Sequence, residues 1–162
     1  MFREMRKKKQ LLSEAESIDI LKSCTSGVLA VSGENGYPYA VPLSYAYRDG
    51  KIYFHFATEG HKLDAIKHND KVSFCVIKTD DVVQETFTTH YRSVIVFGRA
   101  RILADDNEKR RALECLVAKY SPDFSQEGQS EIDRSWNRFL AGEVQIEHMT
   151  GKAAKELIQQ KS

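Results

Sequence analysis

The chain has 162 residues, with 24 Lys and Arg against 23 Asp and Glu and a formal net charge of +1. This balance argues against nucleic acid as the main partner, because nucleic-acid binders usually carry a basic excess. No apolar run approaches the ~20 residues that cross a bilayer, and three scattered cysteines fit reduced thiols. We therefore expect one soluble, cytoplasmic domain over residues 1–162, with no nucleic-acid or membrane partner.

The first part of the chain predicts a helix followed by an antiparallel meander. Ser13 and Glu16 fit a capping box at the start of a helix that runs to about Cys24. Residues 27–31 form an apolar, β-rich run that predicts a buried strand. The pairs Asn35-Gly36 and Asp49-Gly50 predict two tight turns. A second strand is expected over 37–47, after the first turn, and a third over 51–57, after the second. Pro38 and Pro42 place the second strand at an edge or a bulge.

The second part predicts two further hairpin strands, more helices and a final strand. A short helix is expected over 60–68, a strand over 71–77, a loop over 80–86 and a long strand over 91–103 with a bulge at Gly98. Helices are expected from Asp105 or Asp106 to Tyr120 and over 130–140, a strand over 142–149, and a helix from Thr150. About six or seven antiparallel strands can close a small barrel with peripheral helices. The fold class is therefore mainly β, in the α+β group.

A candidate anion site lies where the third strand passes into the short helix. The stretch from Tyr53 turns through Gly60 and opens a helix that carries His61 and Lys62. A helix start offers free N–H groups and the positive end of its dipole. We expect an ammonium and an imidazole added there to form a phosphate clamp.

Several motifs in the right order give the chain a family resemblance. They are Gly36-Tyr-Pro-Tyr-Ala-Val-Pro-Leu-Ser44, Tyr53-Phe-His55, Gly60-His-Lys62 with Asp64, Ile66 and Asn69, and Arg92-Ser-Val-Ile-Val-Phe-Gly-Arg-Ala100. With them the chain resembles the nitroimidazole-resistance (Nim-like) branch of the pyridoxamine 5′-phosphate oxidase-like, FMN-binding split-barrel superfamily. The resemblance implies a six- to seven-stranded, Greek-key-like split barrel. It also implies a homodimer that binds FMN at the subunit interface.

The resemblance also assigns residues to the cofactor. The flavin ring would be lined by Val41, Pro42, Leu43 and Ser44. Phe54, His55, Ala57 and Thr58 would form the adjacent wall, and His61 and Lys62 would take the phosphate. His61 stands where other members of the superfamily carry arginine, and a neutral imidazole offers one donor where a guanidinium offers a fork. Ser93 would contact the flavin, and Trp136 would cover the ring from the partner subunit.

The functional expectation is an FMN-dependent, nitroreductase-like oxidoreductase that reduces nitro-aromatic or similar small acceptors with electrons from a nicotinamide donor. His55 would supply a proton, because the ordinary pKa of histidine lies near ~6.5. FAD stays possible as the cofactor, and a metal site is not expected, since the histidines lack paired ligand spacing.

Two alternatives stay open. One is a flavin- or haem-binding stress or sensor protein without turnover, with His90 or His148 as an axial ligand. The other, less favoured, is a true pyridoxamine 5′-phosphate oxidase, because the C-terminal tail lacks the arginines that would hold its substrate.

Overall fold

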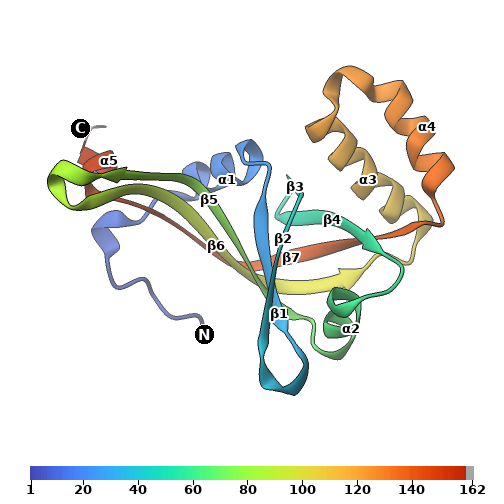
Figure 1. The fold of residues 1–162 in the computed structure, drawn as a ribbon, viewed down its shortest axis with the longest axis horizontal. Helices are drawn as coiled ribbons and strands as arrows, with labels where there is room; N and C mark the ends of the chain where they lie inside the picture. Colours follow the sequence, from blue (N-terminus) through green and yellow to red (C-terminus); the bar gives the residue numbers. More distant parts are fainter. Residues whose placement is uncertain (160–162) are drawn as a thin grey trace.

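The computed structural model describes residues 1–159. One antiparallel sheet in the order β2-β1-β5-β6-β7-β4-β3 curls around the core without closing (Figure 1). Its strands are β1 (Gly27–Ser32), β2 (Pro38–Leu43), β3 (Ala46–Arg48), β4 (Lys51–Ala57), β5 (Lys71–Val83), β6 (Thr88–Ile102) and β7 (Phe139–Ala153). The α-helices are α1 (Glu14–Ser23), α2 (His61–His68), α3 (Asp106–Tyr120), α4 (Ser125–Ser135) and α5 (Lys155–Gln159). The prediction of a mainly β split barrel with peripheral helices is confirmed.

The local signals at the start of the chain form the structures that they predict. The Ser13 hydroxyl accepts a hydrogen bond from the Glu16 backbone N–H, and the Glu16 carboxylate accepts one from the Ser13 N–H, which completes the capping box. Asn35 and Gly36 both have positive φ angles, 55° and 78°, as a tight turn between strands requires. β2 lies at one edge of the sheet, where its prolines disturb only one ladder.

Two of the predicted boundaries in the first half of the chain were wrong. The strand expected over 37–47 is divided into β2 and β3, because Tyr45 turns inward and is fully buried between them. The loop expected from Asp80 is instead the end of β5, which pairs with the first residues of β6 as far as Val83. Figure 1 shows the resulting long hairpin reaching away from the rest of the sheet.

The C-terminal part also differs from the prediction. The helix expected over 130–140 is α4, which starts earlier and ends at Ser135, so that Trp136 and Phe139 lie beyond it. The helix expected from Thr150 begins only at Lys155, because residues up to Ala153 continue β7 and pair with β6. Cross-strand hydrogen bonding therefore overrides the local helix signal.

The bulge expected at Gly98 of β6 lies instead in the facing strand β7, where Glu147 is the extra residue. The register of β6 against β7 shifts between Phe97 and Gly98. A side chain at Gly98 would overlap the Gln145 carbonyl oxygen of β7, so the strands come close enough there that only glycine fits without movement.

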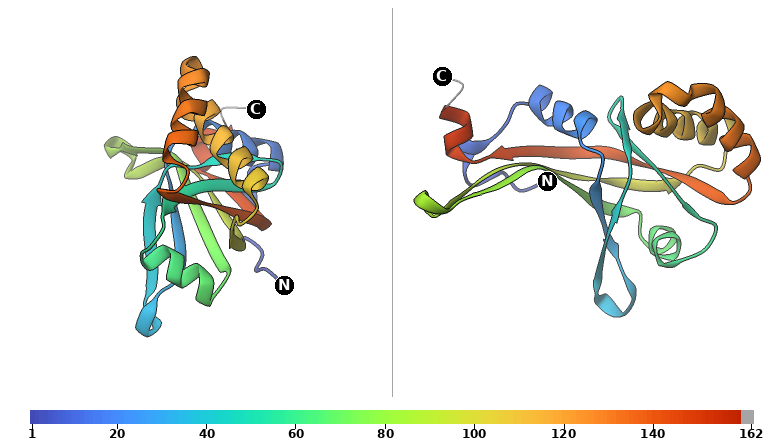
Figure 2. Two further views of the ribbon diagram at one scale, coloured as in Figure 1. Left: turned by 90° about the vertical axis from the view of Figure 1, so that its right-hand side faces the viewer. Right: turned by 45° about the horizontal axis from the view of Figure 1, so that its top comes forward.

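Two hydrophobic clusters fill opposite sides of the curled sheet. The inner cluster contains Leu29, Phe54, Phe74, Val96 and Val144, and α1 and α2 contribute to it. The second cluster lies between α3 and the outer side of β4 and β7, with Ala141 and Leu113 at its centre. Figure 2 shows α3 and α4 at one end of the molecule and the β5–β6 hairpin at the other. Within residues 1–159, no helix is long and apolar enough to span a membrane.

Candidate functional site

The start of α2 is shaped by Gly60. This residue has a φ angle of 130°, which favours glycine, and it turns the chain sharply from the end of β4 into the helix. Its carbonyl accepts hydrogen bonds from the N–H groups of Leu63 and Asp64 at 3.0 and 3.2 Å. No side chain caps the helix, so the first N–H groups of α2 are left for an external anion.

The two basic residues at this helix start point to different sides. The His61 ring stacks on Tyr39 of β2, with ring centroids 4.2 Å apart. Lys62 is half-buried and lies close enough to His55 of β4 to influence its protonation. Lys62 takes part in none of the ion pairs found within residues 1–159. Its ammonium therefore has no carboxylate partner in the described structure.

His55 lies on the outer side of β4, beside Lys62. Its ring meets the Phe139 ring edge-on, with centroids 5.6 Å apart. Partial burial lowers the pKa of His55 below its ordinary value, and the nearby Lys62 ammonium lowers the pKa further because two positive charges repel each other. Both effects favour the neutral imidazole.

The β2 residues assigned to the flavin ring alternate between the two sides of the strand. Val41 and Leu43 pack against the inner cluster, while Pro42 and Ser44 are exposed. Because β2 is an edge strand, its outer edge has no neighbouring strand to bond its backbone groups. A planar ligand could therefore reach both the exposed side chains and that backbone edge.

The remaining assigned residues are distributed over three places. Ala57 and Thr58 are exposed at the end of β4, next to the helix start. The Phe54 side chain is fully buried in the inner cluster, so it is not available to a ligand on the surface. Trp136 packs in the cluster under α3 and α4, where Lys109 Nζ lies 4.3 Å from its ring centroid and 5.8 Å from that of Phe139. Phe139, whose ring contacts His55, packs against the same cluster as Trp136.

Ser93 is not part of this group in one protomer. It lies on β6 opposite Ile77 of β5, on the same outer side as Ile95. His55 pairs with Ala141 of β7 and Ser93 with Lys152 of the same strand, which are eleven residues and therefore roughly 36 Å apart along an extended strand. The protomer brings together His55, Ala57, His61 and Lys62, and leaves Ser93 apart from them.

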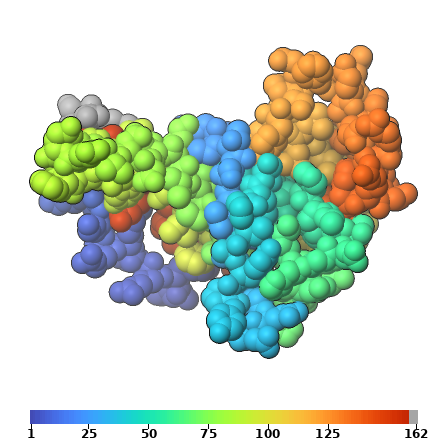
Figure 3. All heavy atoms as spheres, viewed as in Figure 1, coloured from blue at the N-terminus to red at the C-terminus, as the bar shows by residue number. Residues whose placement is uncertain are grey.

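A groove, called here the hairpin groove, adjoins the helix start on the side of His61. It has a volume of about 650 Å³ and is lined by the turn between β1 and β2 (residues 32–36), by one face of α2 with His61, Asp64, Ala65 and His68, and by Asn69. Figure 3 shows the β1–β2 turn (light blue) lying beside α2 (green) at the bottom of the molecule. Sequence reasoning missed this groove and the Tyr39–His61 stacking. The only available signal was the position of Tyr39 inside the motif that begins at Gly36.

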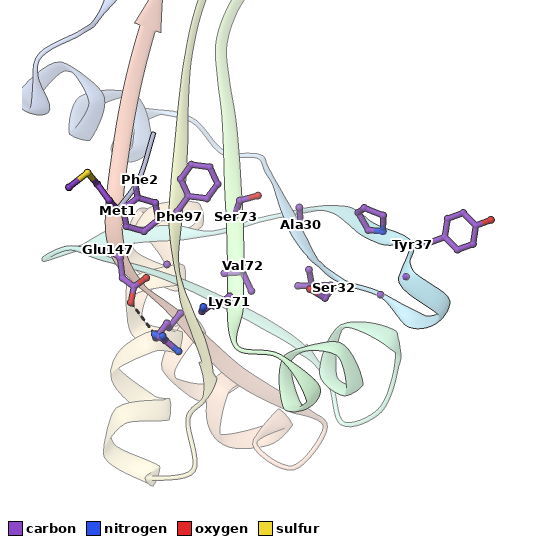
Figure 4. A pocket seen from close by; sticks show the side chains of 16 residues that line it. Met1, Phe2, Ala30, Ser32, Tyr37, Lys71, Val72, Ser73, Phe97 and Glu147 are labelled. Atoms are coloured by element: carbon purple, nitrogen blue, oxygen red, sulfur yellow. Dashed lines mark hydrogen bonds and ion pairs between the residues drawn. The ribbon is translucent and has the colours of Figure 1, made fainter. Parts of the chain in front are cut away.

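A second hollow, of about 690 Å³, lies on the outer side of β1, β5 and β6. Figure 4 shows its apolar wall, which includes Phe97 and Ala30, with Phe2 from the N-terminus above it. The Phe2 ring stacks on His148 with a centroid separation of 4.8 Å. None of the assigned cofactor residues lines this hollow.

Residues 13–153 match the sequence model of the pyridoxamine 5′-phosphate oxidase family. The chain belongs to this family. The matched range contains the whole sheet and the start of α2. No curated protein sequence matches the chain.

Solved structures show how the pyridoxamine 5′-phosphate oxidase family fold recurs. A candidate 5-nitroimidazole antibiotic resistance protein from Bacteroides thetaiotaomicron is 21% identical, with a TM-score of 0.72 over 88% of this chain and 86% of that one. A FAD-binding protein from Mesorhizobium loti is 26% identical, with a TM-score of 0.62 over 90% and 97%. A FAD and haem binding protein from Mycobacterium smegmatis is 22% identical, with a TM-score of 0.77 over 95% and 80%.

Proposed function

We propose that this family member binds a flavin by its phosphate at the start of α2 and acts as a flavin-dependent oxidoreductase. One observation carries the proposal. The Lys62 ammonium, half-buried and without a carboxylate partner among the described residues, stands beside a helix start that no side chain caps. A phosphate would satisfy both the ammonium and the free N–H groups.

The similar structures support the cofactor class and the substrate class. The proteins from M. loti and M. smegmatis are described as binding FAD, and the candidate resistance protein from B. thetaiotaomicron is linked to nitroimidazoles. We therefore propose nitro-aromatic or similar small molecules as electron acceptors and a nicotinamide as the electron donor. FMN would suffice to occupy the phosphate site.

A bound flavin supplies the redox chemistry, taking electrons from the donor and passing them to the acceptor. The phosphate would be held by Lys62 and the free backbone N–H groups at the start of α2, while His61 stays stacked on Tyr39. The ring would lie along Pro42, Ser44 and the outer edge of β2. His55 would deliver a proton to the acceptor. A phosphate bound at Lys62 would offset the ammonium charge, which removes one of the two causes that lower the pKa of His55.

The test begins with the cofactor. The protein as purified should release a flavin on denaturation, identified by mass spectrometry, and its absorption should bleach anaerobically with NADH or NADPH and recover when a nitro-aromatic is added. A His55→Gln variant should retain its flavin content but recover more slowly. A haem spectrum, or a flavin that neither NADH nor NADPH reduces, would contradict the proposal. Either result would favour a flavin- or haem-binding protein without turnover.

We also propose that the working form is a homodimer. Ile77, Ile95 and Phe97 are 61, 42 and 40% exposed on the outer side of β5 and β6. Ile95 pairs with Cys75 of β5, and Cys75 pairs with Val28 of β1. The apolar outer face therefore extends from β6 across β5 to β1. An apolar sheet face of this kind is typical of a surface that a partner covers. We propose that a second copy seated there supplies its Ser93 to the flavin of the first, since Ser93 lies apart from the helix start within one protomer.

An Ile95→Asp substitution tests this surface. The wild-type protein should have twice the 18.5 kDa mass of one chain in light scattering, and Ile95→Asp should have the mass of a single chain, because a buried carboxylate without a partner is costly. Phe124→Asp is the control, since Phe124 is also exposed but lies at the start of α4. A monomeric wild type, or a dimer in both variants, would contradict the proposal.

A further inference from the structure

The far part of the β5–β6 hairpin, called here the arm, ends in an apolar tip that its own protomer does not cover. The arm comprises residues 78–92, beyond the pair formed by Ile77 and Ser93. Figure 2 shows it projecting from the body at the end opposite α3 and α4. At the tip, Val82 is 71% exposed and Phe87 is 97% exposed.

Phe87 is unfavourable at this position for a second, independent reason. Its φ and ψ angles are 53° and 38°, in the left-handed region, where glycine is unstrained and a bulky residue is rare. The tip therefore keeps an aromatic ring in water and in a strained backbone conformation at the same time. A contact between this ring and another surface would account for both.

The tip faces the same way as the surface proposed for the dimer. Successive residues of β6 alternate between the two sides of the sheet, so Thr89 lies on the outer side with Ile95. Val82 pairs with Thr89 and shares that side. The opposite side of β6 faces the inner cluster, to which Val94 belongs and against which α5 packs. The outer side of the arm is thus a continuation of the proposed interface.

The length of the arm matches the distance that it would span in a dimer. When the two-fold axis is perpendicular to the strands, the two copies run in opposite directions, and each arm extends over the body of its partner. From Ile95, in the middle of the proposed interface, to Phe87 is eight residues, or roughly 27 Å of extended strand. On β7, Thr150 pairs with Ile95 and Ala141 pairs with His55. These two residues of β7 are nine apart, or roughly 30 Å, so the tip would arrive beside the partner's His55.

Charge favours a second copy as the occupant. The tip carries three carboxylates, those of Asp80, Asp81 and Glu85. None of them is in an ion pair formed within residues 1–159. Arg138 is exposed, is in none of these ion pairs either, and directly precedes Phe139, whose ring contacts His55. An acidic tip is attracted to such a guanidinium, whereas an anionic membrane surface would repel it.

We propose that the arm of one copy closes over the flavin site of the other and that Phe87 forms one wall of the acceptor pocket. The inference rests on the proposed function and names a residue that selects its acceptors. A planar nitro-aromatic would lie between the flavin ring and the Phe87 ring, because stacked aromatic rings attract each other. An acceptor without an aromatic ring would gain nothing from Phe87.

A Phe87→Ser substitution tests the pocket wall. It should raise the KM for a nitro-aromatic by about twofold to tenfold, the range expected for one lost aromatic contact. The KM for ferricyanide, which has no aromatic ring, should stay unchanged, as should the flavin content and the mass in light scattering. Phe124→Ser is the matched control, since Phe124 is also exposed but lies outside the arm. An unchanged KM for the nitro-aromatic, or the same rise for both acceptors, would overturn the inference.

Mixed dimers show which copy supplies Phe87. Phe87→Ser and Lys62→Ala chains, each with its own tag, are co-expressed, and the heterodimer is purified. If the arm acts on its partner, one site carries both changes and the other carries neither, so about half of the wild-type activity should remain at low acceptor and FMN concentrations. If Phe87 acted within its own copy, both sites would be impaired and the inference would be wrong.

The remaining outcomes separate this inference from the proposed function. Protein that binds a flavin and reduces it with NADH, but whose heterodimer recovers no activity, would overturn the inference alone. Protein that binds no flavin would overturn both. Sedimentation with phosphatidylcholine vesicles that is lost in Phe87→Ser would assign the tip to a membrane surface and would also overturn the inference.

Discussion

Replacing Lys62 with alanine is expected to weaken the binding of FMN by about tenfold to a hundredfold. The half-buried ammonium would be the main charged partner of the phosphate, and hydrogen bonds to charged groups contribute about 1.5–3 kcal/mol. Titrating the apoprotein and following flavin fluorescence measures the change. Riboflavin, which lacks the phosphate, should bind wild type and variant alike.

Lys67→Ala supplies the matched control. Lys67 lies on the same helix but in its last turn, and it is exposed. The two variants remove the same charge, so any difference between them reports position alone. If Lys62→Ala and Lys67→Ala weakened FMN equally, or if riboflavin lost as much affinity as FMN, Lys62 would not be the phosphate ligand.

The Lys62→Ala variant also tests, without any flavin, whether Lys62 lies close to His55. Because the Lys62 ammonium contributes to the lowered pKa of His55, Lys62→Ala should raise that pKa in an NMR titration of the imidazole. Burial lowers the pKa as well, so the ordinary value is not fully restored.

Tyr120→Phe is expected to reduce the free energy of unfolding by about 1–3 kcal/mol, the cost of leaving a buried polar group unpaired. The Tyr120 hydroxyl, at the end of α3, accepts a hydrogen bond from the Tyr45 N–H at 2.8 Å. It donates to the Thr25 carbonyl at 2.5 Å, with the Tyr45 carbonyl 3.0 Å away. One hydroxyl thus connects α3, the β2–β3 junction and the turn before β1.

Urea denaturation measures this effect. The midpoint for Tyr120→Phe should fall with an unchanged slope, since the same surface is exposed on unfolding. Tyr37→Phe is the control, because Tyr37 lies exposed after the β1–β2 turn. Equal midpoints for the two variants would show that the Tyr120 hydroxyl does not stabilise the junction.

Local sequence signals predicted those elements that depend on neighbouring residues. The Ser13 capping box and the Asn35-Gly36 turn need only a few consecutive residues to form, and both are present. By contrast, the far end of β5 contains Asp80 and Asp81, which are typical of loops. They become strand only because residues of β6 pair with them, and a pairing partner cannot be deduced from local composition.

The same distinction applies to the candidate site. The sequence identified the helix start with His61 and Lys62, because a strand, a glycine and a basic helix opening are consecutive. It could not show that the two side chains diverge, since the Tyr39–His61 stacking depends on how the curled sheet brings β2 to α2. Nor could it show the hairpin groove, whose walls come from the β1–β2 turn and α2.

The two edges of the sheet bear on how the protein avoids polymerising. One edge is β2, in which Pro38 and Pro42 offer no backbone N–H, and the other is β3, which is only three residues long. Neither edge is a good template for a foreign strand. Fibre growth by strand addition is thereby discouraged at both margins.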